Sequence, residues 1–213
     1  PACADVIKIG LRAHSGVERG LAQWQPTADY LSRQIPEHQF IIVPHDNLQA
    51  LSDAAREKAF DFVLTNPSSY VEMEMDSGAS RILTFLNKRQ DMALNRFGSV
   101  IFSRSHRADL RTIKDLKGKR LMAVSERAFG GWRVAWREMM EHHGLDPHED
   151  LAALQYGGGI QERVVFAVRD GEVDAGVVRT DMLERMAARG EIELKMFQIL
   201  GGRETDGFPF MHS

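Results

Sequence analysis

The sequence predicts an α/β fold in which helices cover both faces of a mainly parallel sheet. Short apolar runs alternate along the chain with longer segments whose apolar residues recur three or four positions apart, as strands and helices do. Some of these runs, such as residues 40–43, are continuously apolar, which is typical of parallel strands buried on both faces. Strands that alternate with helices favour a parallel sheet.

The first half of the chain contains four expected strands and three expected helices. The strands are residues 6–11, 39–43, 61–64 and 80–86. A helix is expected over residues 27–35, with Pro26 near its start and Leu31 and Ile35 four apart. The next is expected over residues 47–59, with Asn47 as its N-cap, and a third leads from residues 65–69 through Met75.

The second half continues the alternation. The expected strands are residues 92–102, 121–124, 151–156, 173–178 and 193–200, and a turn at residues 114–119 precedes the second of them. A long helix is expected over residues 131–143, because Gly144 and then Pro147 end its pattern. Two shorter helices end at Arg169 and Ala188.

Composition excludes several classes of protein. The 213 residues include 27 Lys and Arg against 30 Asp and Glu, a formal net charge of −3, without a basic tail, so we expect no nucleic-acid partner. No apolar run approaches the roughly 18 residues that span a bilayer, so we expect no membrane span in this segment. The single Cys3 excludes a disulfide framework and a cysteine-based zinc site.

The two ends predict a piece of a longer, exported protein. Ala2 and Ala4 fit the small-residue pattern of a signal-peptidase site, although an arbitrary start would look the same. The other end, residues 207–213, is apolar and has no polar tail of the kind at which free termini usually end.

Polar and glycine-rich segments follow the predicted strands. These segments are residues 12–15, 65–70, 125–132, 157–161 and 179–181. Most lead directly into helices, so backbone N–H groups and positive helix ends would meet at one crevice and favour an anion. Ordinary capping, for example by Ser68 or Asp181, is the alternative for each segment taken singly.

Several motifs resemble the phosphonate-type periplasmic binding domains of bacterial transporters and of some sensor histidine kinases. They are Asp115-Leu116-Lys117-Gly118-Lys119, Phe129-Gly130-Gly131-Trp132, Gly144-Leu145-Asp146-Pro147, Ala167-Val168-Arg169-Asp170-Gly171 and residues 173–181, with residues 65–70 as a weaker match. Residues 128–132, 179–181 and 208–210 look closest to the sensor-kinase branch, in which the chain continues to a membrane helix and a kinase core.

The resemblance implies a two-lobed, periplasmic-binding-protein-like (type II) fold with a two-segment hinge. Residues 1–93 with 192–213 would form lobe 1, and residues 94–191 would form lobe 2. A ligand would bridge the lobes and close them.

Departures from the transporter pattern point to the ligand class. Ser125 is followed by Glu126, Arg127 and Ala128, so most of the hydroxyl cluster that clasps phosphonate is missing. Arg179 stands where transporters often carry an acid that pairs with a ligand amine. A guanidinium suits a carboxylate or a sulfur or phosphorus oxyanion, although a surface ion pair with Asp181 or Glu184 would also explain Arg179.

The candidate ligand-binding residues come from the segments that follow the strands. They are His14, Asn66, Ser68, Tyr70, Ser125, Phe129, Gly130, Gly131, Trp132, Gly158, Gln161 and Arg179. Tyr70, Phe129 and Trp132 would supply aromatic walls, with core packing as the alternative for Trp132. For His14, a solvated loop position is the alternative.

No cofactor, metal or catalytic residue is expected. The run His142, His143, Asp146, His148 and Glu149 falls where a helix ends, and histidine is favoured there by the helix dipole. No nucleophile elbow or His-Glu-x-x-His motif is present, and the glycine triplet 157–159 lacks the lysine of a phosphate-binding loop.

The sequence therefore predicts the periplasmic, non-catalytic sensor domain of a histidine kinase, which binds a small anion between two lobes. We expect the parent kinase to form a homodimer. The alternatives are a solute-binding protein of a phosphonate or oxyanion ABC transporter, an enzyme of the same two-lobed fold, and the effector domain of a transcription regulator.

Overall fold

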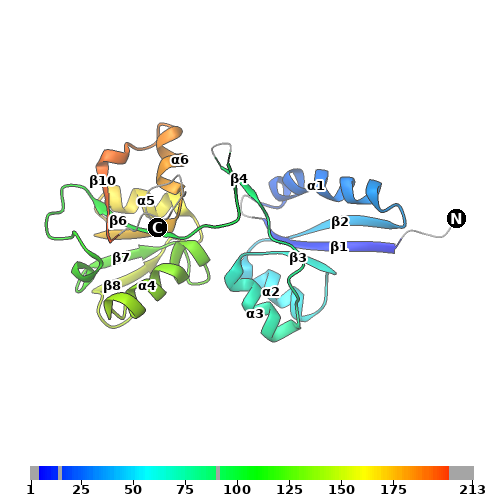
Figure 1. The fold of residues 1–213 in the computed structure, drawn as a ribbon, viewed down its shortest axis with the longest axis horizontal. Coiled ribbons are helices and arrows are strands. Elements are labelled where there is room, and N and C mark those ends of the chain that lie inside the picture. Colours follow the sequence, from blue (N-terminus) through cyan, green and yellow to red (C-terminus); the bar gives the residue numbers. More distant parts are fainter. Residues whose placement is uncertain (1–4, 14–15, 90–91, 202–213) are drawn as a thin grey trace. The chain divides into compact units, whose positions relative to one another are not determined.

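The computed structural model describes residues 5–13, 16–89 and 92–201 (Figure 1). The chain forms two compact units, one up to Leu83 and the other from Thr84 onward. Several predictions concern residues outside the described ranges: the cleavage-site residues Ala2 and Ala4, the ligand residue His14 and the apolar end 207–213.

The first unit is a three-stranded parallel sheet between helices. Its strand order is β2-β1-β3, with β1 over Asp5–Arg12, β2 over His38–His45 and β3 over Phe62–Leu64. Helix α1 (Val17–Gln34) covers one face, and α2 (Leu48–Arg56) and α3 (Pro67–Ser77) lie on the other (Figure 1). Alternate strand residues, among them Ile9, Leu11 and Ile42, pack against α1.

Helix α1 begins ten residues before the predicted start at residue 27, so that prediction is wrong. Pro26, expected near the helix start, lies in its interior. Leu21, Trp24 and Leu31 recur at helical spacing and pack with the buried Ala28 on the core. This packing stabilises the helix on both sides of Pro26, which has no backbone N–H to donate to the helical hydrogen bonds. Pro26 itself faces solvent.

The second unit is built on a five-stranded mixed sheet in the order β10-β6-β9-β7-β8. Its strands are β6 (Ser99–Arg104), β7 (Arg120–Ala123), β8 (Ala153–Tyr156), β9 (Ala175–Arg179) and β10 (Phe197–Ile199). Strands β7, β8 and β9 run parallel, and β6 lies antiparallel between β9 and β10.

Each face of this sheet carries its own core. Val100, Phe102 and Val178 pack with residues of α5 (Gln161–Arg169) and α6 (Met182–Ala188). On the other face, Ile101 and Val177 pack with α4 (Val134–His143). The alternation along β6 is what places neighbouring residues in different cores. The predicted α/β class is confirmed.

Three predicted strands differ from the observed structure. Residues 80–86 have the apolar content of a strand, but they form no ladder with any described strand and have no regular structure. The run 92–102 splits in two: β5 (Met92–Leu94) pairs with β4 (Asn87–Arg89) as a hairpin, and β6 starts afresh at Ser99. The run 193–200 begins with a 3-10 turn over Leu194–Met196 and shortens to strand β10, which pairs with β6 in the sheet of the second unit.

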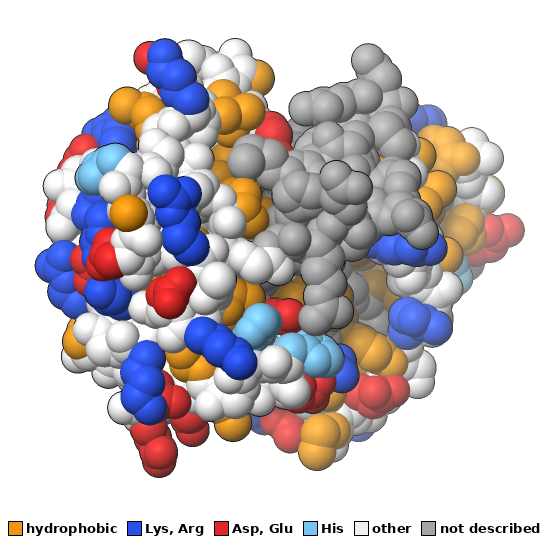
Figure 2. Space-filling view, turned by 60° about the vertical axis from the view of Figure 1, so that its left-hand side comes forward, with side chains coloured by type: hydrophobic (Ala, Val, Ile, Leu, Met, Phe, Trp, Pro, Cys, Tyr) orange, Lys and Arg blue, Asp and Glu red, His pale blue; other side chains and the backbone are white. Residues whose placement is uncertain are grey.

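Positive and negative side chains are interspersed on the face of the second unit that is turned forward in Figure 2. This face therefore has no large patch of one charge. The described helices include none that is long and apolar enough to cross a membrane.

Candidate functional site

The carboxyl ends of β1, β2 and β3 bring three polar residues to one edge of the first unit. Arg12 and His45 are register partners at the last positions of β1 and β2. Leu11 pairs with Leu64, so Thr65, the next residue, comes beside Arg12. Side chains alternate between the two faces of a sheet along each strand. Because Leu11 packs toward α1, the next residue, Arg12, faces the side of the sheet on which α2 and α3 lie, and His45 and Thr65 face the same side.

These side chains hold buried polar atoms without hydrogen-bond partners among the described residues. The atoms are Arg12 Nε, His45 Nε2 and Thr65 Oγ1. The hydroxyl of the fully buried Ser69 also has no hydrogen-bond partner among the described residues. A buried polar atom that forms no hydrogen bond costs about 1–3 kcal/mol, so such a cluster calls for an explanation.

Burial also disfavours charge at this edge. It lowers the pKa of the Arg12 guanidinium and of the His45 imidazole. Asp46 partly offsets the lowering for His45, whose ring meets the edge of the Phe60 ring at a centroid distance of 5.8 Å. His45 is therefore held toward its neutral form.

The candidate set from the sequence omitted all four of these residues. In the sequence, Arg12, Thr65 and Ser69 belong to polar segments that follow predicted strands, and no such segment includes His45. The signal that identifies them is strand register, which shows that the last residues of separate strands are neighbours.

The predicted residues of the first unit make local contacts in α3. Asn66 is the N-cap, and its Oδ1 accepts a hydrogen bond from the Ser69 N–H at 3.1 Å. The Tyr70 hydroxyl donates to Glu74 Oε1 at 2.7 Å, and this bond raises the pKa of Tyr70. Ser68 is half-buried in the first turn of α3.

In the second unit, the loops after β7 and β8 are tied together through their backbones. The Gly157 N–H donates to the Ala123 carbonyl and the Gly159 N–H to the Val124 carbonyl, both at 2.8 Å. Gly158 lies between them with φ +67° and open space where a Cβ would stand. Ser125, half-buried, follows β7 at this edge.

Arg179 and Gln161 are joined at the end of β9. The Arg179 backbone N–H donates to Gln161 Oε1 at 2.8 Å, and the Arg179 guanidinium lies 4.4 Å from the centroid of the Phe97 ring. Asp181, two residues after Arg179, is buried and has φ +76°. Residues other than glycine adopt this backbone conformation only at a cost in conformational energy. Strained residues of this kind concentrate at functional sites.

A π-helix over Phe129–Arg133 carries the other predicted residues of this unit. A Cβ on Gly130 would stand 2.7 Å from the Gly98 carbonyl oxygen, and one on Gly131 would stand 2.5 Å from Val124 Cγ2, so packing requires both glycines. Phe129 meets the Phe97 ring edge-on at 5.4 Å. Single π-turns of this kind are frequent at functional sites.

Trp132 is fully buried and stacks on Trp136 at a centroid distance of 5.8 Å. It belongs to the core that faces α4, which is the packing alternative foreseen for it. The described residues include no group of three or more His, Cys, Asp or Glu able to hold a metal ion. In the histidine run at the end of α4, His143 Nε2 lies 3.2 Å from Glu138 Oε1.

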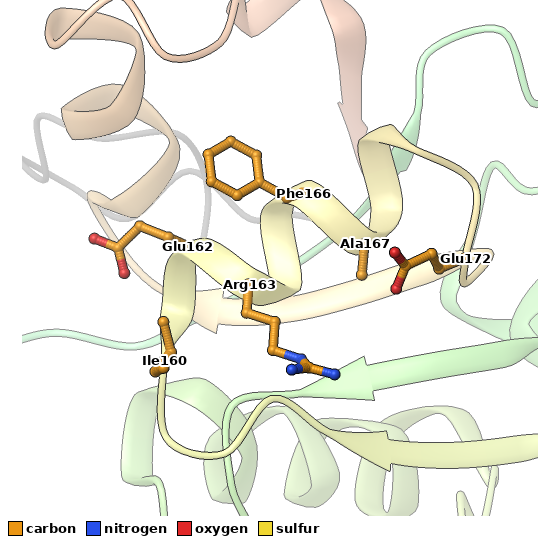
Figure 3. A pocket seen from close by; sticks show the side chains of 6 residues that line it. All are labelled: Ile160, Glu162, Arg163, Phe166, Ala167 and Glu172. Atoms are coloured by element: carbon orange, nitrogen blue, oxygen red, sulfur yellow. The ribbon is translucent and has the colours of Figure 1, made fainter.

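A shallow groove of about 480 Å³ runs along α5 (Figure 3). Its lining residues are Ile160, Glu162, Arg163, Phe166, Ala167 and Glu172. None of them belongs to the candidate set, so the strand edges remain the candidate site.

Comparisons with known proteins agree with this architecture. Residues 10–212 match the family described as the phosphonate ABC transporter, periplasmic substrate-binding protein. The chain is 32% identical over 205 residues to the tetrathionate sensor histidine kinase TtrS of Salmonella typhimurium. That alignment covers 96% of this chain and 34% of the kinase, so the chain spans about a third of the length of this relative.

Two solved structures share the fold. One is PhnD1 from Prochlorococcus marinus in complex with methylphosphonate, with TM-score 0.69, 18% identity, and coverage of 93% of this chain and 72% of that one. The other is a binding-protein component of a phosphonate ABC transporter from Pseudomonas aeruginosa, with TM-score 0.68, 13% identity, and coverage of 99% and 68%. The chain belongs to the family of phosphonate-type periplasmic substrate-binding proteins.

Proposed function

We propose that this chain is the periplasmic ligand-binding domain of a sensor histidine kinase and that it binds a small anion without converting it. The observation that carries the proposal is the 32% identity to a sensor kinase across nearly the whole chain. The family is described as one of substrate-binding proteins, which supports a binding role for this domain.

The strand edges support an anion as the ligand. Two arginines, Arg12 and Arg179, end strands β1 and β9. Helices α2 and α3 begin within a few residues of the ends of β2 and β3, so their positive ends lie at the same edge. A guanidinium binds carboxylates and sulfur or phosphorus oxyanions through charge-assisted hydrogen bonds.

Signalling would follow from ligand binding, because a ligand with different affinity for two arrangements of the domain shifts their populations. Since β10 pairs with β6, we place residues up to Ile199 in the second lobe. The parent kinase, its homodimer and its membrane anchor belong to this proposal. A solute-binding protein of a transporter is the second candidate, favoured by the family description.

The test of anion binding is a thermal-shift titration of the 213-residue chain with tetrathionate, thiosulfate, sulfate and methylphosphonate, and with arginine as a cationic control. We expect at least one anion to raise Tm, because a ligand that binds only the folded state stabilises it by mass action. Stabilisation by arginine alone would refute the proposal.

Arg179→Ala should abolish the anion-dependent rise in Tm and leave the circular dichroism spectrum unchanged. Arg185→Ala is the matched control, because Arg185 is exposed on the neighbouring helix α6. If both variants respond to the anion as the unmodified chain does, Arg179 is not a ligand residue. A membrane helix and kinase motifs in the flanking gene sequence would decide between sensor and transporter.

A further inference from the structure

We infer that Arg12, His45 and Thr65 form an oxyanion-binding subsite in the first unit, where His45 takes up a proton as the anion binds. The inference rests on the proposed function and deepens it, because it names the residues that recognise the anion's charge on this edge. None of the three was in the candidate set drawn from the sequence.

Strand register places the three side chains together. Arg12 lies directly opposite His45 in the parallel ladder, and Thr65 follows the pair Leu11–Leu64, so the three residues come from the ends of β1 and β2 and from the position just after β3. Residues opposite each other in a parallel ladder point to the same face. The subsite is therefore built on the rigid end of a sheet.

The helices on that face add positive electrostatic potential. Helix α2 starts at Leu48, just after β2, and α3 starts at Pro67, just after β3. Both have eight or more residues, and the N-terminus of each carries roughly half a positive charge. No carboxylate among the described side chains forms an ion pair with Arg12.

The buried polar atoms define the ligand chemistry. Arg12 Nε can only donate a hydrogen bond, the Thr65 hydroxyl can donate, and His45 Nε2 donates once it is protonated. An oxyanion offers acceptors alone and satisfies all three atoms, whereas a cation satisfies none. Three donors from three strands suit a group with three terminal oxygens, such as a sulfonate, thiosulfonate or phosphonate.

Proton uptake follows from the surroundings of His45. The charged group that acts on the imidazole is Asp46 after β2, which favours protonation; Arg12 is the register partner on β1, and the Phe60 ring packs against the imidazole. Burial lowers the pKa of His45, so the imidazole enters neutral at pH 7. An anion between Arg12 and His45 reverses this balance and favours the imidazolium.

The experiment is isothermal titration calorimetry of the 213-residue chain with tetrathionate and, separately, thiosulfate, neither of which takes up a proton near pH 7. Titrations at pH 7.2 run in Bis-Tris and in Tris, which differ in ionisation enthalpy and contain no sulfonate. We expect a fraction of a proton to be taken up per anion bound, and Kd to rise by up to tenfold per pH unit above the pKa of free His45. His45→Gln should bind more weakly and take up no proton, whereas His106→Gln, an exposed control, should behave as the unmodified chain.

Two further variants test the subsite itself. Arg12→Gln and Thr65→Val should each weaken binding by about tenfold or more, since each removes a charge-assisted hydrogen bond to the anion. If Arg12→Gln fails to fold, His45→Gln and Thr65→Val still decide the matter. Unchanged affinity in these variants, with binding lost in Arg179→Ala, refutes the subsite and leaves the proposed function standing.

Binding without buffer-dependent heat refutes the proton uptake on His45. Failure of the unmodified chain to bind either anion, or any anion in the thermal-shift series, refutes the proposed function itself. The two failures are thus distinguishable.

Discussion

At the scale of single residues, Asp174 forms a network of ion pairs and hydrogen bonds with two arginines away from the candidate site. It accepts hydrogen bonds from Arg107 Nη1 at 2.8 Å and from the backbone N–H and Nε of Arg120 at 2.9 and 3.1 Å. Burial by itself would raise the pKa of Asp174, but the bonds from Arg120 and Arg107 hold this pKa well below its usual range. These contacts lie at the end of β7 opposite to Ser125, so they stabilise the unit and leave the candidate edge untouched.

Asp174→Asn should therefore lower the free energy of unfolding by about 1–3 kcal/mol at pH 7, because Arg107 and Arg120 lose a charged acceptor. A carboxylate with a depressed pKa contributes stability above its ordinary pKa, and that contribution is lost as the pH falls below about 4. The difference in the free energy of unfolding between variant and parent, measured by urea unfolding, should thus shrink as the pH is lowered from 5 to 3.

The control is Asp170→Asn, which removes the exposed pair with Arg169 and should leave the free energy of unfolding nearly unchanged. An Asp174→Asn variant with the same pH profile as its parent would show that the network contributes nothing.

At the residue scale, the candidate site could be predicted only in part. Ser125, Gly158 and Arg179 were predicted because they follow apolar runs, and they do lie just after or at the ends of strands β7, β8 and β9. The partners of Asn66 and Gln161 were not predictable, since capping and an amide contact depend on backbone geometry. His45 was missed because its neighbour Arg12 is distant in sequence and becomes adjacent only through the register.

At the scale of elements, the strands and helices that bury apolar residues were predictable. The runs that became β1, β2, β7 and β9 are apolar enough to be recognised. The start of α1 was not, because Gly16 and Pro26 both carry signals that suggest a helix boundary. Residues 80–86 failed as a strand because a strand also needs a partner, which periodicity cannot show.

Pro26→Ala tests what holds α1 together. The substitution restores a backbone N–H at a solvent-exposed position inside the helix and removes the clash of the proline ring with the preceding turn. We expect a gain of about 1–2 kcal/mol, since freedom gained by the unfolded chain offsets part of the benefit. A loss of stability in thermal and urea unfolding would mean that a bend at Pro26 serves the packing of Leu21 and Leu31.

Gly131→Ala tests the π-helix. The new Cβ would stand 2.5 Å from Val124 Cγ2, so either the residue that follows β7 or the helix must shift, at a cost of about 1–3 kcal/mol. Glu141→Ala, on the exposed face of α4, is the control and should be nearly neutral. Equal melting temperatures for the two variants would show that the π-turn adjusts freely.

At the scale of the whole molecule, the segment 82–86 gives the chain an apolar surface. Ile82, Leu83 and Leu86 are 67%, 76% and 65% exposed and lie close together in the sequence. Contiguous apolar surface of this kind promotes association. The 213-residue chain should therefore self-associate as its concentration rises. The double substitution Leu83→Lys and Leu86→Lys should reduce the fraction of associated protein measured by sedimentation velocity.

A double substitution of the exposed Lys114 and Lys117 to Ser is the control, and it should leave the association unchanged. A chain that sediments as a monomer at every concentration would contradict the prediction.

The position of β6 has a consequence for how the protein is made. The first unit needs no residue beyond β3 to close its sheet, so it can fold before the later strands are available. In the second unit, β6 is synthesised before its neighbours β9 and β10, and Phe102 must find Ile199 from the far end of the unit. Contacts of such long sequence separation are slow to form. The second unit is therefore expected to fold last, and to be the part that chaperones and proteases meet first.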